Sequence, residues 1–410
     1  MLGAAAVTPL ARSGWRAPAG DPAGPGFRIR TVTAGTKLRG PGDTEALQDA
    51  FTFLKSAKQA LVDAGYEVQT LRVATQPFLE DAGSRARAAA LAPLQALDRA
   101  VVAEGVLLSI GPVLAPDGND PDFPGWAAEL ARTTQNVSFS VRVASPDRVA
   151  SPLGVTAAGE AMAAIAHATP GGLGNFRFAA AANVPAGTPF FPVAYHSGSD
   201  AVAIGLESPP LLAAAFAGAN TLADAKQRLT QSLESRLGPL ERLMRGVARR
   251  DERGYTGIDV SPAPGKDASI GAAIEGLTGV PFGAASTLAA CAAITDVLKS
   301  LRIKTCGYSG LMLPVLEDPV LAQRASEGRF TVRELLLYST VCGTGLDVVP
   351  FAGAVGGDQL AALVADVAAL STKLRKPLSA RLFPVPGRKV GEVAKFANPY
   401  LTDCAVMKPE

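Results

Sequence analysis

The spacing of hydrophobic residues predicts alternating strands and helices from residue 27 onward. Residues 27–33 alternate apolar and polar side chains, as expected of a strand with one face buried. From Thr44 to Ala64 the apolar positions recur every three or four residues, which indicates a helix that ends at Gly65. Residues 66–73 alternate again. The chain therefore opens with a predicted strand, helix and strand.

The same alternation continues to the C-terminus. Further strands are predicted at residues 105–112, 137–144, 176–182, 201–207, 257–260, 341–350 and 378–387. Further helices are predicted at residues 84–104, 122–134, 157–168, 209–219, 221–246, 286–301, 331–338 and 357–375. Strands that alternate with helices favour a parallel or mixed sheet covered by helices. Because no linker rich in serine, proline or one charge divides residues 27–410, we predict a single large α/β domain.

The composition favours a small-molecule partner. The chain has 410 residues, 48% of them hydrophobic, which supports an extensive core. Its 39 basic and 37 acidic residues are scattered and give a net charge of +2, so the charge does not favour nucleic acid or an anionic membrane as a partner. No uninterrupted apolar run approaches the roughly 20 residues that cross a bilayer. A homodimer formed through an apolar helical surface is a further expectation.

Two sequence features bear on the location of the protein. The four cysteines are far apart and lack the spacing of a zinc site, which favours a reducing compartment and thus the cytoplasm. Residues 1–26 are rich in proline and glycine and are predicted to be a flexible leader outside the folded domain. Arg12 and Arg16, with no acidic residue in the first 20, support organellar targeting as a weaker alternative.

The segment 183–196 is predicted to be a shaped loop beside a ligand site. Its prolines restrict the backbone, Gly187 permits unusual turns, and it ends at His196, one of only two histidines. A histidine exchanges protons near neutral pH, so we predict that His196 acts as a general acid or base. The alternative is that His196 hydrogen-bonds the loop backbone.

Three acidic residues are predicted to join His196 around one cavity. Glu207 and Asp259 each close a short apolar run, and Asp347 follows the glycine-rich residues 342–346. In α/β proteins, the ends of strands and the loops after them commonly build the ligand site. We therefore predict catalytic roles for His196, Glu207, Asp259 and Asp347. The alternative is that these carboxylates cap helices or pair with arginines.

Five further residues are predicted to contact the substrate: Arg177, Asn183, Thr188, Tyr195 and Cys342. Arginine suits an anionic group through charge-assisted hydrogen bonds, and the same reasoning applies to three other basic residues: Arg381, Arg388 and Lys389. Thr188 and Tyr195 either orient a ligand or support the loop. Cys342 is either a nucleophile or a small buried residue, because the sequence shows no base or helix start that would stabilise its thiolate.

No cofactor signature is present in the sequence. The glycine-rich residues 171–175 and 276–279 do not follow a strand and open a helix, as a site for NAD or ATP requires. Two carboxylates and His196 are also a ligand set for a divalent cation, which keeps a metal among the alternatives.

Several motifs occur together in order: Ile29–Thr33, Asn183–His196, Ile204–Glu207, Gly257–Asp259, Cys342–Asp347 and Pro384–Gly387. In this respect the chain resembles, over residues 27–410, the family catalogued as domain of unknown function 711, whose bacterial members are often called PFL family proteins. The resemblance implies an α/β barrel related to the pyruvate formate-lyase-like fold, with strands around a central site and long loops entering from their ends. It implies no particular reaction, because function lies in the site and not in the fold.

The sequence departs from that of glycyl-radical enzymes. Residues 386–388 read Pro-Gly-Arg and residues 390–392 read Val-Gly-Glu, neither of which matches the Arg-Val-Ser-Gly-Tyr type of radical loop, and no two cysteines are adjacent. We therefore predict a non-radical enzyme that acts on a small polar or anionic metabolite by acid-base chemistry. The alternative is a noncatalytic protein that binds a small molecule or serves in assembly.

Overall fold

The fold is built on one mixed sheet of nine strands in the computed structural model, which describes residues 26–146 and 150–410. The strands are β1 (Arg28–Thr36), β2 (Val68–Thr75), β3 (Val106–Pro112), β4 (Val137–Ala144), β5 (Phe178–Ala182), β6 (Ala201–Glu207), β7 (Gly254–Pro262), β8 (Gly345–Ala352) and β9 (Leu378–Val385). Each corresponds to a predicted strand, with bounds that differ by a few residues. The predicted leader lies outside the described residues, apart from Gly26.

The sheet consists of a central block of strands and two flanking pairs that run in the opposite direction. The order across the sheet is β7-β6-β1-β2-β3-β4-β5-β9-β8. Strands β1 to β5 are parallel to one another. Strand β6 is antiparallel to β1, and β9 is antiparallel to β5, while β6 pairs with β7 and β9 with β8 in parallel. The parallel block is therefore flanked on both sides by strands of the opposite direction.

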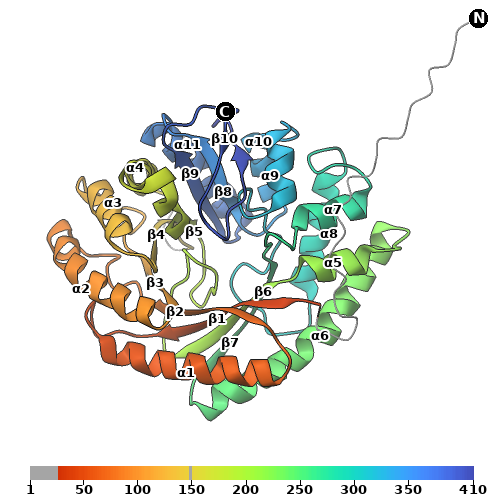
Figure 1. The fold of residues 1–410 in the computed structure, drawn as a ribbon, viewed down its shortest axis with the longest axis horizontal. Coiled ribbons are helices and arrows are strands. Elements are labelled where there is room, and N and C mark those ends of the chain that lie inside the picture. The colour runs from red at the N-terminus through yellow and green to blue at the C-terminus, as the bar shows by residue number, and fades with distance from the viewer. Residues whose placement is uncertain (1–25, 147–149) are drawn as a thin grey trace, which may run out of the picture.

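Helices surround the sheet as an outer ring (Figure 1). They are α1 (Thr44–Asp63), α2 (Ser84–Ala103), α3 (Phe123–Thr133), α4 (Pro152–Ala168), α5 (Pro209–Phe216), α6 (Leu222–Arg250), α7 (Ile270–Thr278), α8 (Thr287–Ser300), α9 (Pro319–Ser326), α10 (Val332–Ser339) and α11 (Gly357–Leu374), with a 3₁₀ segment η1 (Pro170–Arg177). A hairpin of β10 (Val393–Ala394) and β11 (Cys404–Ala405) lies near the C-terminus. No helix in residues 26–146 and 150–410 is long and apolar enough to cross a bilayer.

The sheet curves into a barrel-like wall that strand pairing does not close. Its edge strands β7 and β8 are not paired with each other. An irregular segment, residues 305–316, lies between them. Its Thr305 forms a bridge with Ile258 of β7, and its Pro314 forms one with Asp347 of β8. The predicted α/β class and barrel-like arrangement are confirmed, with this segment filling the gap between the edge strands.

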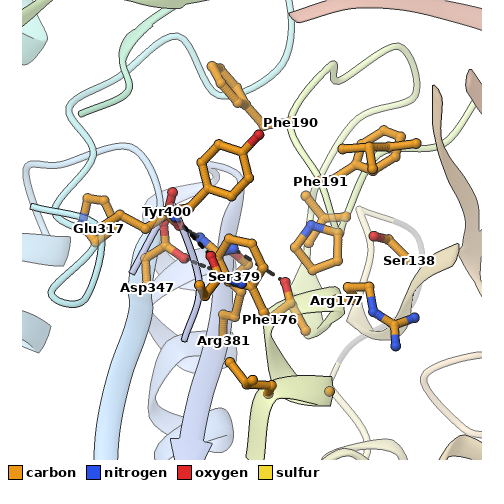
Figure 2. A pocket seen from close by; sticks show the side chains of 18 of the residues that line it. Ser138, Phe176, Arg177, Phe190, Phe191, Glu317, Asp347, Ser379, Arg381 and Tyr400 are labelled. Atoms are coloured by element: carbon orange, nitrogen blue, oxygen red, sulfur yellow. Dashed lines mark hydrogen bonds and ion pairs between the residues drawn. The ribbon is translucent and has the colours of Figure 1, made fainter. Parts of the chain in front are cut away.

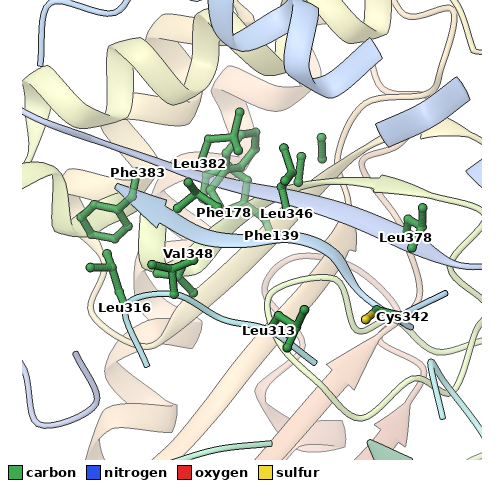
Figure 3. Packing of buried hydrophobic residues seen from close by; sticks show 14 of the residues in the cluster. Phe139, Phe178, Leu313, Leu316, Cys342, Leu346, Val348, Leu378, Leu382 and Phe383 are labelled. Atoms are coloured by element: carbon green, nitrogen blue, oxygen red, sulfur yellow. The ribbon is translucent and has the colours of Figure 1, made fainter. Parts of the chain in front are cut away.

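The side chains of β9 alternate between the outer core and the barrel interior. On β9, Leu378, Ala380 and Leu382 belong to the apolar core, whereas Ser379 and Arg381 are the polar positions between them. Figure 3 shows the outer core beside β8 and β9, where Leu382 packs near Phe178. On β9 the interior therefore receives the polar positions, whereas on β5 it receives Ala179 and Ala181.

The loop of residues 183–200 enters this interior, as the resemblance implied for long loops. Thr33 of β1 donates a hydrogen bond to the carbonyl of Pro189 (3.1 Å), and Ser109 of β3 donates one to the carbonyl of Ala194 (2.7 Å). A Cβ atom at Gly35 of β1 would lie 2.2 Å from the His196 ring, so only glycine allows this close approach. The loop divides the interior and forms one wall of a cavity.

Candidate functional site

A cavity of about 500 Å³ lies inside the curved sheet. We call it the arginine cavity, because Arg30 of β1, Arg72 of β2 and Arg381 of β9 all line it. Asp347 of β8 and Glu317, which precedes α9, line it as well. In Figure 2, Glu317, Asp347 and Arg381 gather on one side and Phe191 of the loop lies across from them. A cavity of this volume accommodates a small molecule.

A chain of alternating charges runs along one wall of the arginine cavity. Arg381 bonds Asp347 through Nε (2.7 Å) and Glu317 through Nη2. The other oxygen of Glu317 bonds Arg30 (3.1 Å), and Arg30 also bonds Glu207 (3.0 Å). These side chains are almost entirely buried, so each charge relies on its neighbours in place of water. The wall is consequently rigid and electrostatically paired.

Arg72 differs from the other two arginines because no carboxylate in the described residues lies within ion-pairing distance of it. Its Nε donates a hydrogen bond to Thr70 Oγ1 (3.2 Å), and its guanidinium lies over the Phe191 ring at 4.9 Å from the centroid. Arg72 is only 8% exposed. Burial and the adjacent Arg30 lower the pKa of Arg72 to about 9. An anionic ligand would supply the missing negative charge.

Asp347 presents a free carboxylate oxygen to the cavity. Its Oδ1 accepts the hydrogen bond from Arg381, and no donor among the described residues bonds Oδ2. Burial raises the pKa of the Asp347 carboxyl and Glu317 adds to this effect, although Arg381 opposes it. A carboxyl with a raised pKa suits proton transfer.

Hydroxyl and aromatic groups complete the lining. Tyr308 donates a hydrogen bond to Ser379 Oγ (2.8 Å), which in turn donates to the carbonyl of Thr344 (3.1 Å). Tyr400 stacks on Phe176, with ring centroids 6.3 Å apart and planes inclined at 17°. The aromatic rings give the cavity apolar walls beside its charged wall, which suits a ligand that has both an anionic group and an apolar body.

The structure does not bring the four predicted acid-base residues together. Asp347 lines the arginine cavity, and Glu207 lies behind its wall as a partner of Arg30. His196 and Asp259 are not among the lining residues. The expected single cluster is therefore divided, because the loop and the strand ends turn their polar groups towards different parts of the interior.

His196 lies in a separate, narrow hollow of about 10 Å³ together with Thr188. Its ring packs against Gly35, and its buried Nε2 has no hydrogen-bond partner among the described residues. Burial lowers the pKa of His196 from its ordinary value of 6.5. These contacts favour the alternative in which His196 supports the loop.

This burial predicts a pH-dependent stability. Because the unfolded chain binds the proton of His196 more readily than the folded protein does, the free energy of unfolding should fall as the pH drops below about 6.5. We expect His196→Gln to remove the loss of stability that comes from this histidine. His167→Gln, at an exposed position of α4, should show the same loss as the wild type. Urea unfolding between about pH 8 and pH 5 measures both slopes. Equal slopes in the wild type and in His196→Gln would contradict the prediction.

Asp259 accepts four hydrogen bonds and anchors the segment 305–316 to β7. It accepts bonds from the backbone N–H groups of Tyr308 (2.8 Å) and Ser309 (2.9 Å), and from both the backbone and the hydroxyl of Ser261. Burial raises the pKa of the Asp259 carboxyl, and these donors oppose that shift. Three of these bonds go to Oδ1 and one to Oδ2, and Asp259 does not line the arginine cavity, so the arrangement supports a positioning role for Asp259.

The predicted substrate contacts are also distributed. Arg177 lines the arginine cavity, but its guanidinium donates to carbonyls of residues 131, 134 and 137 and to the Thr134 hydroxyl, and Figure 2 shows it directed away from Arg381. Three loop residues bond protein groups: Asn183 bonds Ser371, Thr188 bonds the carbonyl of Pro185, and Tyr195 bonds the carbonyl of Val184. Cys342 is buried and lines another cavity. Arg388 and Lys389 are exposed.

The divalent cation kept as an alternative finds no ligand cluster in the part of the chain that the structure describes. No group of three or more histidine, cysteine, aspartate or glutamate side chains there is arranged to hold a metal ion. His196, Glu207 and Asp259, the set considered from the sequence, point to different partners.

Sequence reasoning missed the residues that define the arginine cavity, with the exceptions of Asp347 and Arg381. Arg30 and Arg72 stand inside predicted strands, Arg30 between Ile29 and Thr31 and Arg72 between Leu71 and Val73. Such alternation is ordinarily typical of a strand whose polar face meets solvent. The two arginines were therefore visible in the sequence as polar positions of strands. That these positions face an interior and not solvent depends on the curvature of the whole sheet.

The fold and this cavity define a barrel-like α/β protein with a charged cavity inside its sheet. The family model described as "Uncharacterised ACR (DUF711)" matches residues 25–398, so the chain belongs to this family and the predicted resemblance is confirmed. A UPF0210 protein of Pyrobaculum arsenaticum is 38% identical over 239 residues, 55% of this chain and 52% of the relative, so the chain spans about half the length of that relative. UPF0210 proteins of Pelobacter propionicus and Syntrophobacter fumaroxidans are 27% and 28% identical, over 90% of this chain and 88% of each relative. These names specify no reaction.

Proposed function

We propose that the arginine cavity binds a small metabolite through its carboxylate or phosphate group, and that the protein converts this metabolite by acid-base chemistry. The observation that carries the proposal is Arg72, a buried guanidinium without a carboxylate partner in the described residues. A buried charge of this kind is costly unless a ligand neutralises it. Its planar guanidinium is suited to two parallel hydrogen bonds with a carboxylate or phosphate.

Asp347 is the proposed proton-transfer group. It lines the same cavity as Arg72, its Oδ2 is open, and burial raises its pKa. The ion pair with Arg381 holds the carboxyl in one orientation, which supports transfer at a defined atom of the ligand. The hydroxyl of Tyr308 is a second group on this wall, and its bond to Ser379 fixes its position.

The test begins with the ligand that copurifies with the wild-type protein, identified by mass spectrometry after denaturation. We expect Asp347→Asn to bind this ligand but to convert it at least about 100-fold more slowly, since a carboxamide cannot exchange a proton in this way. Asp366→Asn, at an exposed position of α11, is the matched control and should keep full turnover. Wild-type turnover in Asp347→Asn would refute the catalytic role. Binding without turnover in the wild type itself would favour the noncatalytic alternative.

We place the protein in the cytoplasm as part of this proposal. The support comes from the four dispersed cysteines, all of which are free thiols in the structure.

A further inference from the structure

A second cavity, of about 290 Å³, adjoins the arginine cavity. We call it the lysine cavity, because Lys299 at the end of α8 and Lys376 just before β9 both line it. The loop from Thr340 to Gly343 forms another side. Tyr308 lines both cavities and so belongs to the wall between them. The lysine cavity opens at the amino ends of β8 and β9, where Lys299 is exposed and Lys376 is half-buried.

The two ammonium groups are oriented by backbone carbonyls. Lys299 Nζ donates to the carbonyl of Tyr308 (2.7 Å), and Lys376 Nζ donates to the carbonyls of Thr340 (2.8 Å) and Cys342 (2.6 Å). An ammonium carries three N–H bonds. Two on Lys299 and one on Lys376 are thus without an acceptor in the described residues. Carbonyl bonds hold both groups in place and leave these donors for a ligand.

The charge of the lysine cavity is positive. Neither lysine has a carboxylate within ion-pairing distance in residues 26–146 and 150–410. The one acidic residue in the lining, Asp296, pairs with Lys226 on the outer surface (2.9 Å). Burial raises the pKa of Cys342 well above its ordinary range, so its thiol is neutral. Burial also lowers the pKa of Lys376 to about 8, and the nearby Lys299 ammonium acts in the same direction. Asp259, behind the wall, acts to raise the pKa of Lys299 against the effect of burial, but no carboxylate of the described residues pairs directly with either ammonium.

We propose that the lysine cavity is a second anion site, which binds a small phosphate or carboxylate compound between Lys299 and Lys376. It is distinct from the arginine cavity and does not depend on the function proposed there. Its volume suits a small anion or dianion of a few heavy atoms. Solvent reaches it directly, so the anion exchanges without passing through the barrel interior.

The first experiment is isothermal titration calorimetry with inorganic phosphate and with succinate, on full-length protein carrying Arg72→Met so that the arginine cavity does not contribute. We expect at least one of the two anions to bind. The anion that binds more tightly then shows whether the site prefers a phosphate or a carboxylate group. Adding Lys376→Met should weaken binding at least about tenfold, a difference of about 1.4 kcal/mol. Adding Lys373→Met, an exposed lysine on α11, should leave it unchanged. Affinity should also fall as the pH rises through about 8, where Lys376 loses its charge.

A second measurement uses the unsubstituted protein and does not depend on the folding of any variant. Brief acetylation with acetic anhydride, followed by peptide mapping, should show slower modification of Lys376 when the binding anion is present, whereas Lys373 is modified at the same rate. The proposal is overturned if neither anion binds to the Arg72→Met protein, if Lys376→Met and Lys373→Met bind alike, or if the anion does not protect Lys376.

Discussion

Replacing Arg72 with methionine is expected to weaken binding of the copurifying metabolite about 100-fold, which corresponds to about 2.7 kcal/mol. Arg72 supplies the cavity charge that no carboxylate in the described residues pairs with, and a charge-assisted contact in a buried site is worth several kilocalories per mole. Methionine keeps much of the apolar stem and its packing on Phe191 while removing the charge. Calorimetric titration of the ligand into wild type and variant measures the difference.

The same substitution should not destabilise the unliganded protein. Arg72 is buried without an ion-pair partner in the described residues, so its removal eliminates a desolvation cost and the free energy of unfolding should stay equal or rise. Arg132→Met is the control, because Arg132 also lines the cavity but is exposed and paired with Glu129 (2.7 Å). If both variants lose the same affinity, the ligand responds to the general positive potential of the cavity and not to a specific contact with Arg72. A marked loss of stability in Arg72→Met would show that the residue serves the fold.

Most of the fold was predictable because its elements are long and strongly patterned. The helix of residues 44–63 and the strands around it repeat their apolar positions with clear periods. Helices α7 and α9 were not predicted, although α5 and α10, which are as short, were. Both begin at one buried carboxylate: Asp318 accepts bonds from Ile270 N–H of α7 and from Leu321 N–H of α9. That contact joins positions far apart in the sequence.

The site was less predictable because it depends on direction and not only on position. The prolines of residues 183–196 correctly indicated a shaped loop beside a cavity. Which way each loop residue points is decided by contacts with distant strands: Gly35 receives the His196 ring, while Phe191 faces Arg72. Similarly, Asp259 and Asp347 both belong to predicted strands. The backbone N–H of Ser309 bonds the Asp259 carboxylate, whereas Arg381 bonds only one oxygen of Asp347 and leaves the other open.

Glu317 is expected to be the residue of the cavity wall on which stability depends most. It is shared between two buried guanidiniums, Arg30 and Arg381, one at each oxygen. Glu317→Leu would leave both with an unpaired donor and excess positive charge in a buried wall. Removing one partner from a buried ionic network typically costs about 3–5 kcal/mol, and we expect the free energy of unfolding to fall by that amount. Urea unfolding followed by circular dichroism measures it.

The control and the rescue separate this effect from a general loss of charge. Glu129→Leu removes an exposed carboxylate that pairs with Arg132, and should cost less than about 1 kcal/mol. If desolvated arginine is the cause, then adding Arg30→Met to Glu317→Leu should restore part of the stability, because one of the two guanidiniums that lost the Glu317 partner is then gone. The free energy lost on adding Arg30→Met to Glu317→Leu can be compared with the loss that Arg30→Met causes in the wild type. If the two losses are equal, the two residues act independently. The ionic wall would then not be a coupled unit, and the rigid orientation that it gives Asp347 through Arg381 would lose its physical basis.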